Sequence, residues 1–217
     1  MIRNIISVFA VTAIIILCSC SSDTGTGTVP TDTLAVNLGN SYLPLSKGYT
    51  WNSTSTKVTP SVIIRDTITG IDTIVGKAYY AMDITGLNAK TYYRLDSTKL
   101  YMMGPNFHGV DSTKEFFLLD FNTAVGDSNM FYGHDKINNV EQKTNITTKA
   151  RGITYKTADG TEYSNVIKFT IAYSIYVSSA WYSNGGYDVY YAKGVGKVAE
   201  DYGVKGKIEL KNYNFKK

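Results

Sequence analysis

The chain has 217 residues and a formal net charge of +4, with 43% hydrophobic and 18% charged residues. This length fits one domain that can bury a core without disulfides, and the composition excludes collagen, coiled coils and outright disorder, which need a strong bias. The charge is too small and too dispersed to indicate nucleic acid as a partner. Two histidines and two cysteines leave few candidate ligands for a metal.

Residues 1–19 are typical of a secretory signal peptide. Arg3 precedes an apolar run from Ile5 to Leu17, which is too short to cross a bilayer as a stable helix. The end of this run resembles the bacterial lipobox, with Leu17 three positions before Cys20 and the small Ser19 directly before it. Cys20 is therefore the predicted lipidation site. A plain secretion signal or a membrane-spanning anchor is the alternative.

The predicted mature chain begins at Cys20 and contains no other cysteine, so no disulfide is expected. Lipid chains on Cys20 would anchor the protein to a membrane without threading it through. Residues 20–40 are mostly small and polar, which predicts a flexible tether. Residues 41–217 are predicted to form a single β domain.

From Tyr42 onward, alternating apolar and polar residues predict β-strands, and no sustained helical pattern occurs. The clearest strand is 163–177, in which Ile167, Phe169 and Ile171 share one face. The other predicted strands are 49–58, 62–68, 73–84, 90–95, 99–103, 115–119, 141–148, 152–157, 186–193, 195–202 and 205–213.

Turn-forming pairs separate these strands. The predicted turns are Thr69-Gly70, Asp159-Gly160, residues 184–186 and Tyr202-Gly203. Asp159-Gly160 is the strongest hairpin signal, because a type I′ turn needs positive φ at both central positions. The predicted fold class is all-β: an antiparallel meander that forms a barrel, a half-open barrel or a sandwich, preceded by the tether.

Several phrases resemble a family of secreted lipoproteins of Bacteroidota. They include YLPL at 42–45, followed by Gly48 and Trp51, and GVGKV at 194–198. The resemblance implies a β-rich extracytoplasmic domain, and it contributes no catalytic residue. The implied location is the outer membrane, facing the periplasm or the cell surface. On physical grounds alone, Trp51 can plug one end of a barrel, and the glycines of GVGKV suit a bulge or a close approach.

The chain offers little for catalysis. His108 and His134 lie in glycine-rich turns without the spacing of a zinc site or a nucleophile–base pair. Asp120 and Asp127, with Glu115 nearby, could act as paired carboxylates of a glycoside hydrolase, but turn formation and solvation explain them more simply. We therefore predict no enzymatic activity, no metal site and no cofactor.

An aromatic group suggests binding instead. Trp181, Tyr182 and Tyr187 fall near a predicted hairpin loop, where they would form an exposed surface that stacks on a glycan or packs against a protein partner. Core packing is the alternative interpretation. The predicted function is a membrane-anchored, non-enzymatic binding module.

A second function remains open at this point. A barrel interior could carry a lipid or another apolar ligand, which requires an unfilled apolar cavity. Inward residues such as Ile167, Phe169, Ile171 and Tyr173 would line that cavity.

Aspartate followed by serine or threonine recurs along the chain, which resembles the O-glycosylation acceptor motif of exported proteins of Bacteroidota. The alternative is that these pairs simply form turns. The candidate acceptors are Thr33, Thr67, Thr73, Ser97 and Ser112.

Overall fold

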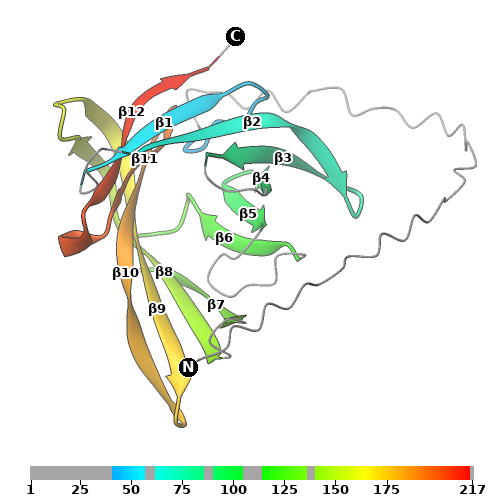
Figure 1. Cartoon of the computed structure of the whole chain (residues 1–217), viewed down its shortest axis with the longest axis vertical. Coiled ribbons are helices and arrows are strands. Elements are labelled where there is room, and N and C mark those ends of the chain that lie inside the picture. Colours follow the sequence, from blue (N-terminus) through cyan, green and yellow to red (C-terminus); the bar gives the residue numbers. More distant parts are fainter. Residues whose placement is uncertain (1–40, 57–61, 86–89, 105–113, 136–139, 216–217) are drawn as a thin grey trace, which may run out of the picture. The chain divides into compact units, whose positions relative to one another are not determined.

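The computed structural model of the chain describes residues 41–56, 62–85, 90–104, 114–135 and 140–215. These residues form twelve β-strands and one 3-10 helix, η1 (Gly203–Lys205), so the predicted all-β class is confirmed (Figure 1). The predicted signal peptide and tether, with Cys20, Thr33 and Ser112, lie outside the described residues. The strands are β1 (Thr50–Ser55), β2 (Ile63–Ile74), β3 (Lys77–Ile84), β4 (Lys90–Asp96), β5 (Lys99–Met103), β6 (Phe116–Asp120), β7 (Ser128–Asp135), β8 (Val140–Lys156), β9 (Glu162–Val177), β10 (Ala180–Ala192), β11 (Gly196–Asp201) and β12 (Lys207–Asn214).

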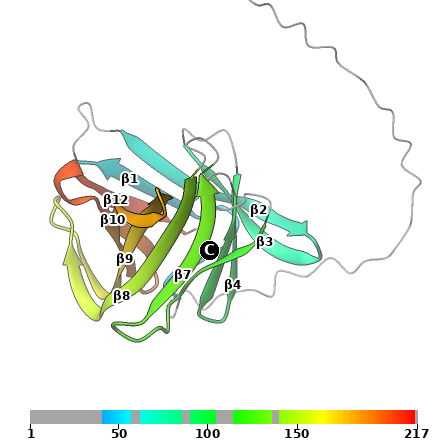
Figure 2. The same ribbon diagram turned by 90° about the horizontal axis from the view of Figure 1, so that it is seen from below.

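All twelve strands belong to one antiparallel meander, in the order β6-β5-β4-β3-β2-β1-β12-β11-β10-β9-β8-β7. The chain starts in the middle of the sheet, runs outward to β6, crosses to the other edge at β7 and returns to β12 beside β1. Figure 2 shows these strands arranged around a common interior. The sheet therefore curls into a nearly closed barrel, which decides between the barrel and sandwich alternatives.

Side chains bring the two edges of the sheet together. No backbone ladder pairs β6 with β7 in the part of the chain that the structure describes. The side-chain amide of Asn129 in β7 instead donates to the carbonyl oxygens of Phe117 (3.2 Å) and Leu118 (3.3 Å) in β6. The rings of Phe116 and Phe131 also lie 5.5 Å apart across the junction. This closure leaves the two edge strands covered without a full set of ladder hydrogen bonds.

Residues 41–51 pack against the turn between β10 and β11. The indole nitrogen of Trp51 donates to the carbonyl oxygen of Val195 (2.7 Å), and the backbone nitrogen of Gly194 donates to the carbonyl oxygen of Ser41 (2.7 Å). Gly196 has φ +105°, and a Cβ there would lie 3.0 Å from the Trp51 indole nitrogen. The predicted close approach at Gly196 is thus confirmed. That Trp51 plugs one end of the barrel stays a prediction.

Packed rings fill the interior near β9. Phe121, just after β6, meets Tyr191 at 5.2 Å and Phe169 at 6.2 Å between ring centroids, both nearly edge-on. Phe169 is 1% exposed and Ile167 is fully buried. Burying a large apolar side chain contributes about 1.5–3 kcal/mol, so this region stabilises the barrel.

Two predicted turns are wrong. Gly70 lies within β2, where the pairing with β3 shifts, and residues 184–186 lie within β10, where the pairing with β9 shifts. The chain reverses instead at Val75-Gly76 and Ser178-Ser179, and both residues of each pair have positive φ. These two-residue turns fit the type I′ geometry without the Asn-Gly or Asp-Gly signal. The register of the flanking strands therefore overrides the local turn preference here.

The turn at Asp159-Gly160 is present but is not of type I′. Of the two residues, only Gly160 has positive φ (94°). Asp159 instead stabilises the turn through its carboxylate, which accepts hydrogen bonds from the Thr157 hydroxyl (2.6 Å) and the Thr161 backbone nitrogen (3.1 Å).

Two further differences concern β7 and β8. The predicted strands 141–148 and 152–157 form one strand, β8, whose pairing with β9 shifts at several points along its second half. Bulges of this kind bend a strand and locally break its alternation. The sequence predicts no strand over β7, because it shows no clear alternation there.

Candidate functional site

The three predicted binding residues lie on a strand. Trp181, Tyr182 and Tyr187 belong to β10 and not to a hairpin loop, because the chain turns earlier, at Ser178-Ser179. Neighbouring residues of a strand point to opposite faces. The predicted single aromatic surface of all three residues is therefore wrong in its geometry.

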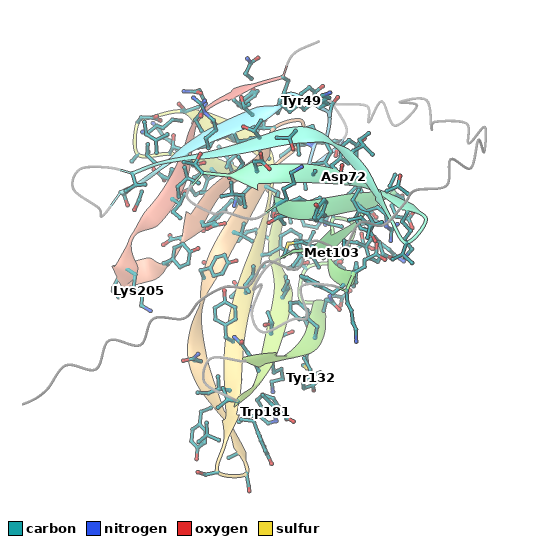
Figure 3. The ribbon with its side chains drawn as sticks, turned by 45° about the vertical axis from the view of Figure 1, so that its right-hand side comes forward. Tyr49, Asp72, Met103, Tyr132, Trp181 and Lys205 are labelled. Carbon is teal, nitrogen blue, oxygen red and sulfur yellow. The ribbon has the colours of Figure 1, made fainter. Side chains whose placement is uncertain are left out.

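Trp181 belongs to a group of rings on the outer face of the barrel, here called the outer aromatic cluster: Tyr132 of β7, Tyr176 of β9 and Trp181 of β10. The centroid of the Trp181 ring lies 5.2 Å from that of Tyr176 and 6.0 Å from that of Tyr132. The Lys143 ammonium lies 4.8 Å from the Trp181 ring, within the range of a cation–π interaction. Figure 3 shows Trp181 and Tyr132 at the end of the β domain opposite Tyr49.

The rings of the outer aromatic cluster are open to solvent to different degrees. Tyr132 is 65% exposed and Tyr176 is 39% exposed, whereas Trp181 is half-buried between them. Because exposed aromatic side chains that touch one another form a contiguous apolar surface, this cluster has the character of an interaction site.

Tyr187 lies inside the barrel. It pairs with Ile171, and its ring stacks on Tyr202 at 4.7 Å and lies 6.1 Å from Tyr173. We call Tyr173, Tyr187 and Tyr202 the inner tyrosine cluster. Burial raises the pKa of each of the three phenols above its usual range. Tyr182 joins neither cluster and is 53% exposed.

The lining expected of a lipid carrier is packed. Ile167, Phe169 and Ile171 are each at most 4% exposed and belong to the continuous hydrophobic core. They do not line the interior cavity described next. Tyr173 is partly accessible, but it faces Tyr187.

A cavity lined by both polar and apolar side chains lies in the barrel interior close to Trp51. Its volume is about 40 Å³, which gives room for about three water molecules. Residues from the N-terminal segment, β1, β2, β3, β4, β10 and β11 line it: Leu43, Trp51, Ser53, Asp66, Met82, Tyr93, Tyr191 and Lys197.

Charged groups in and beside this cavity interact closely. The Lys197 ammonium lies 2.6 Å from one carboxylate oxygen of Glu200, and the Tyr202 hydroxyl donates to the other at 2.6 Å. Burial alone would lower the pKa of Lys197, but the negative charges of Glu200 and Asp66 raise it well above its usual value. Burial raises the pKa of the Asp66 carboxyl, an effect that Lys197 partly offsets.

Sequence reasoning missed this cavity. Lys197 stands within the GVGKV phrase, and its partner in the sheet is the inward-facing Tyr191. A lysine at an inward position of a strand is the signal that could have revealed it, because lysine is almost never buried without a partner. In the sequence, Asp66 stands out only as part of the acceptor motif at Thr67.

The acidic residues considered for hydrolysis have other partners. Burial alone would raise the pKa of Glu115, but hydrogen bonds from Arg94 and Lys77 lower it to about 2. Asp120 accepts a hydrogen bond from the Asn122 backbone nitrogen (2.8 Å) in a tight turn. Within the described ranges, no group of three metal-ligating side chains occurs. His108 lies outside those ranges, and only the backbone of His134 is described.

The described acceptor candidates for glycosylation differ in access. Thr73 is exposed in β2, and Ser97 is exposed in the turn between β4 and β5. Thr67 is half-buried and pairs with Thr50 and Asp83 in the neighbouring strands. Modification at all of these positions stays a prediction.

No protein-family model and no curated protein matches the sequence. Among solved structures, the chain is similar to an inferred exported protein with a YmcC-like fold from Bacteroides fragilis, at 13% identity and a TM-score of 0.47, over 81% of this chain and 100% of that one. It is also similar to an inferred lipoprotein from Parabacteroides distasonis, at 12% identity and a TM-score of 0.40, over 81% of this chain and 99% of that one. These similarities assign no role to any residue of this chain.

Within the described residues, no helix is long and apolar enough to cross a membrane.

Proposed function

We propose that this protein is a membrane-anchored, extracytoplasmic lipoprotein of the outer membrane that acts as a non-enzymatic binding module for a glycan. The outer aromatic cluster is the observation that supports binding. The lipobox-like sequence that ends at Cys20 supports the anchor, and the polar residues 20–40 would let the β domain stand away from the lipid surface.

The chemistry of the outer aromatic cluster favours a glycan over a smaller apolar ligand. The rings of Tyr132 and Tyr176 are exposed to solvent. Trp181 packs against Tyr176, and the Lys143 ammonium lies over the Trp181 ring. Aromatic rings combine a flat apolar body with polar edges, which suits a sugar ring with an apolar face and peripheral hydroxyls. The Lys143 ammonium adds a hydrogen-bond donor beside the rings.

No observation favours the lipid carrier as a second function. Its expected lining of Ile167, Phe169 and Ile171 is packed in the core, and the interior cavity near Trp51, at about 40 Å³, is too small for a lipid. A protein partner at the outer aromatic cluster is an alternative outcome of the binding test.

Glycan binding is tested with the detergent-solubilised lipoprotein on an array of purified polysaccharides. For a polysaccharide that binds on the array, Trp181→Ala is expected to weaken the free energy of binding by about 1–3 kcal/mol, the scale of one aromatic anchor. Tyr182→Ala is the matched control, because Tyr182 is the next residue and is exposed on the other face of β10. Equal losses in both variants, or binding to no polysaccharide on the array, would contradict the proposal.

The anchor is tested separately by mass spectrometry of the membrane fraction. We expect a chain that begins at an acylated Cys20. The variant Cys20→Ala is expected to leave the membrane fraction, whereas Cys18→Ala, the matched control, is expected to remain in it. An intact N-terminus at Met1 would contradict the anchor.

A further inference from the structure

The interior cavity contains a carboxylate oxygen without a partner. Oδ1 of Asp66 is enclosed by protein and accepts no hydrogen bond from the described residues. Asp66 pairs with Trp51 in the sheet, and both side chains line the cavity. Leaving a buried polar atom unsatisfied costs about 1–3 kcal/mol, and more for a charged group. Such an atom in a cavity with room for a guest points to a ligand that donates hydrogen bonds.

Lys197 does not supply the missing partner. Its ammonium is engaged at 2.6 Å by Glu200, whose second oxygen is bound by the Tyr202 hydroxyl. Two carboxyl groups, those of Glu200 and Asp66, therefore face one ammonium, so the cluster carries one uncompensated negative charge when Asp66 is ionised. A buried charge is stabilised by pairing, so a positively charged guest complements the cavity.

The other walls suit a small cation. Trp51, Tyr93 and Tyr191 line the same cavity, and aromatic rings attract cations through their negative faces. The volume of about 40 Å³ limits the guest to a group the size of a few water molecules. The Lys197 side chain, which lines the cavity, is 35% exposed, so this wall of the cavity is accessible to solvent.

We propose that this cavity is a binding site for the ammonium group of a small primary amine, with Asp66 as its counter-ion and hydrogen-bond acceptor. This site is separate from the outer aromatic cluster. Its failure would leave the proposed glycan site untouched, and the converse also holds.

The first test uses calorimetric titration of the full chain at constant ionic strength. Methylammonium chloride is the probe, and tetramethylammonium chloride and sodium chloride are the comparators. We expect saturable binding of methylammonium only, because tetramethylammonium is larger and has no N–H to donate. Equal responses to all three salts, or no saturable response to methylammonium, would overturn the proposal.

Variants identify the residues. Asp66→Asn keeps the shape of the side chain and removes its charge, so methylammonium binding is expected to fall by at least about tenfold. Asp83→Asn makes the same change at an exposed position of the neighbouring strand β3 and is expected to leave binding unchanged.

Lys197→Met provides a test of opposite sign. Removing this positive charge leaves Glu200 and Asp66 without a competing ammonium, so methylammonium is expected to bind more tightly. An unchanged or weaker affinity in Lys197→Met would overturn the proposed charge balance. If Asp66→Asn does not fold, this variant and the salt series still decide the question. Trp181→Ala is expected to bind methylammonium like the wild type.

Discussion

The outer aromatic cluster and the inner tyrosine cluster share the two strands β9 and β10 but lie on opposite faces of the barrel wall. Trp181 pairs with the outward-facing Tyr176, whereas Tyr187 pairs with the inward-facing Ile171. Tyr187 follows Trp181 by six positions, an even number, so a regular strand would place both rings on one face.

A bulge accounts for the difference. Between Ser183 and Gly186, β10 advances three positions while β9 advances two, from Ser174 to Ala172. One extra residue reverses the alternation of all residues that follow it. The comparison teaches that a single inserted residue assigns one ring to a candidate binding surface and the other to the interior.

The largest expected loss of stability comes from adding a side chain at this bulge, where Gly186 lies close to the backbone of β9. A Cβ at Gly186 would lie 2.3 Å from the carbonyl oxygen of Ile171, so Gly186→Ala is expected to cost about 3 kcal/mol of unfolding free energy. Chemical denaturation measures it. Gly185→Ala is the matched control: it meets no atom within 4 Å, but Gly185 has φ +96°, so a loss of about 1 kcal/mol is expected. A larger loss in Gly185→Ala would contradict this account of the bulge.

The next largest expected effect is a difference between the two clusters in the unfolding free energy that is lost when one ring is removed. Tyr187→Ala is expected to lower the free energy of unfolding by about 2–3 kcal/mol, because it removes a ring that packs against Tyr173 and Tyr202. Trp181→Ala is expected to cost about 1 kcal/mol or less, because much of its surroundings is solvent. The same denaturation experiment ranks the two variants, and a reversed order would contradict the assignment of faces.

Alkaline pH is expected to act on the inner tyrosine cluster. The pKa values of these phenols are raised in the folded state, so their contribution to stability is complete below pH 10 and is lost as pH rises toward the folded-state values. The free energy of unfolding should fall above pH 10, and it should fall less steeply in Tyr187→Phe. Identical slopes for this variant and the wild type would count against a buried Tyr187 hydroxyl.

The smallest effect is expected at Tyr182. This side chain is 53% exposed and belongs to neither cluster, so Tyr182→Ala should change the free energy of unfolding by no more than about 0.5 kcal/mol. A clear loss of stability would show that Tyr182 packs against the domain more closely than its exposure indicates.

Much of the fold could be predicted from the sequence, because strand patterns are local. Alternation over 163–177 predicted β9 closely, and the Trp51 and Gly196 phrases predicted a close approach that the structure confirms. Bulges are harder to predict from sequence than strands. The composition and turn propensity of Ser183–Gly186 are the same for a bulge within a strand as for a turn between two strands. The glycines there indicated a loop, which placed the aromatic residues wrongly.

The interior cavity depends on contacts between distant residues. Asp66, Tyr93 and Lys197 come from β2, β4 and β11, and only the order of strands brings them together. Asp66 is followed by a threonine in a half-polar strand, so its inward orientation could not be separated from a surface position without the register. Lys197 alone offered a local signal, as an inward lysine among apolar neighbours.

Hydroxyl-radical footprinting of the lipoprotein, with and without a captured glycan, tests the central claim most directly. The chain contains only two tryptophans, and Trp51 is 4% exposed. We predict that Trp181 is oxidised faster than Trp51, and that saturating glycan slows oxidation of Trp181, Tyr132 and Tyr176 while Tyr187 and Trp51 keep their rates. A glycan that protects Tyr187 and leaves Trp181 unprotected would contradict the assignment of binding to the outer face.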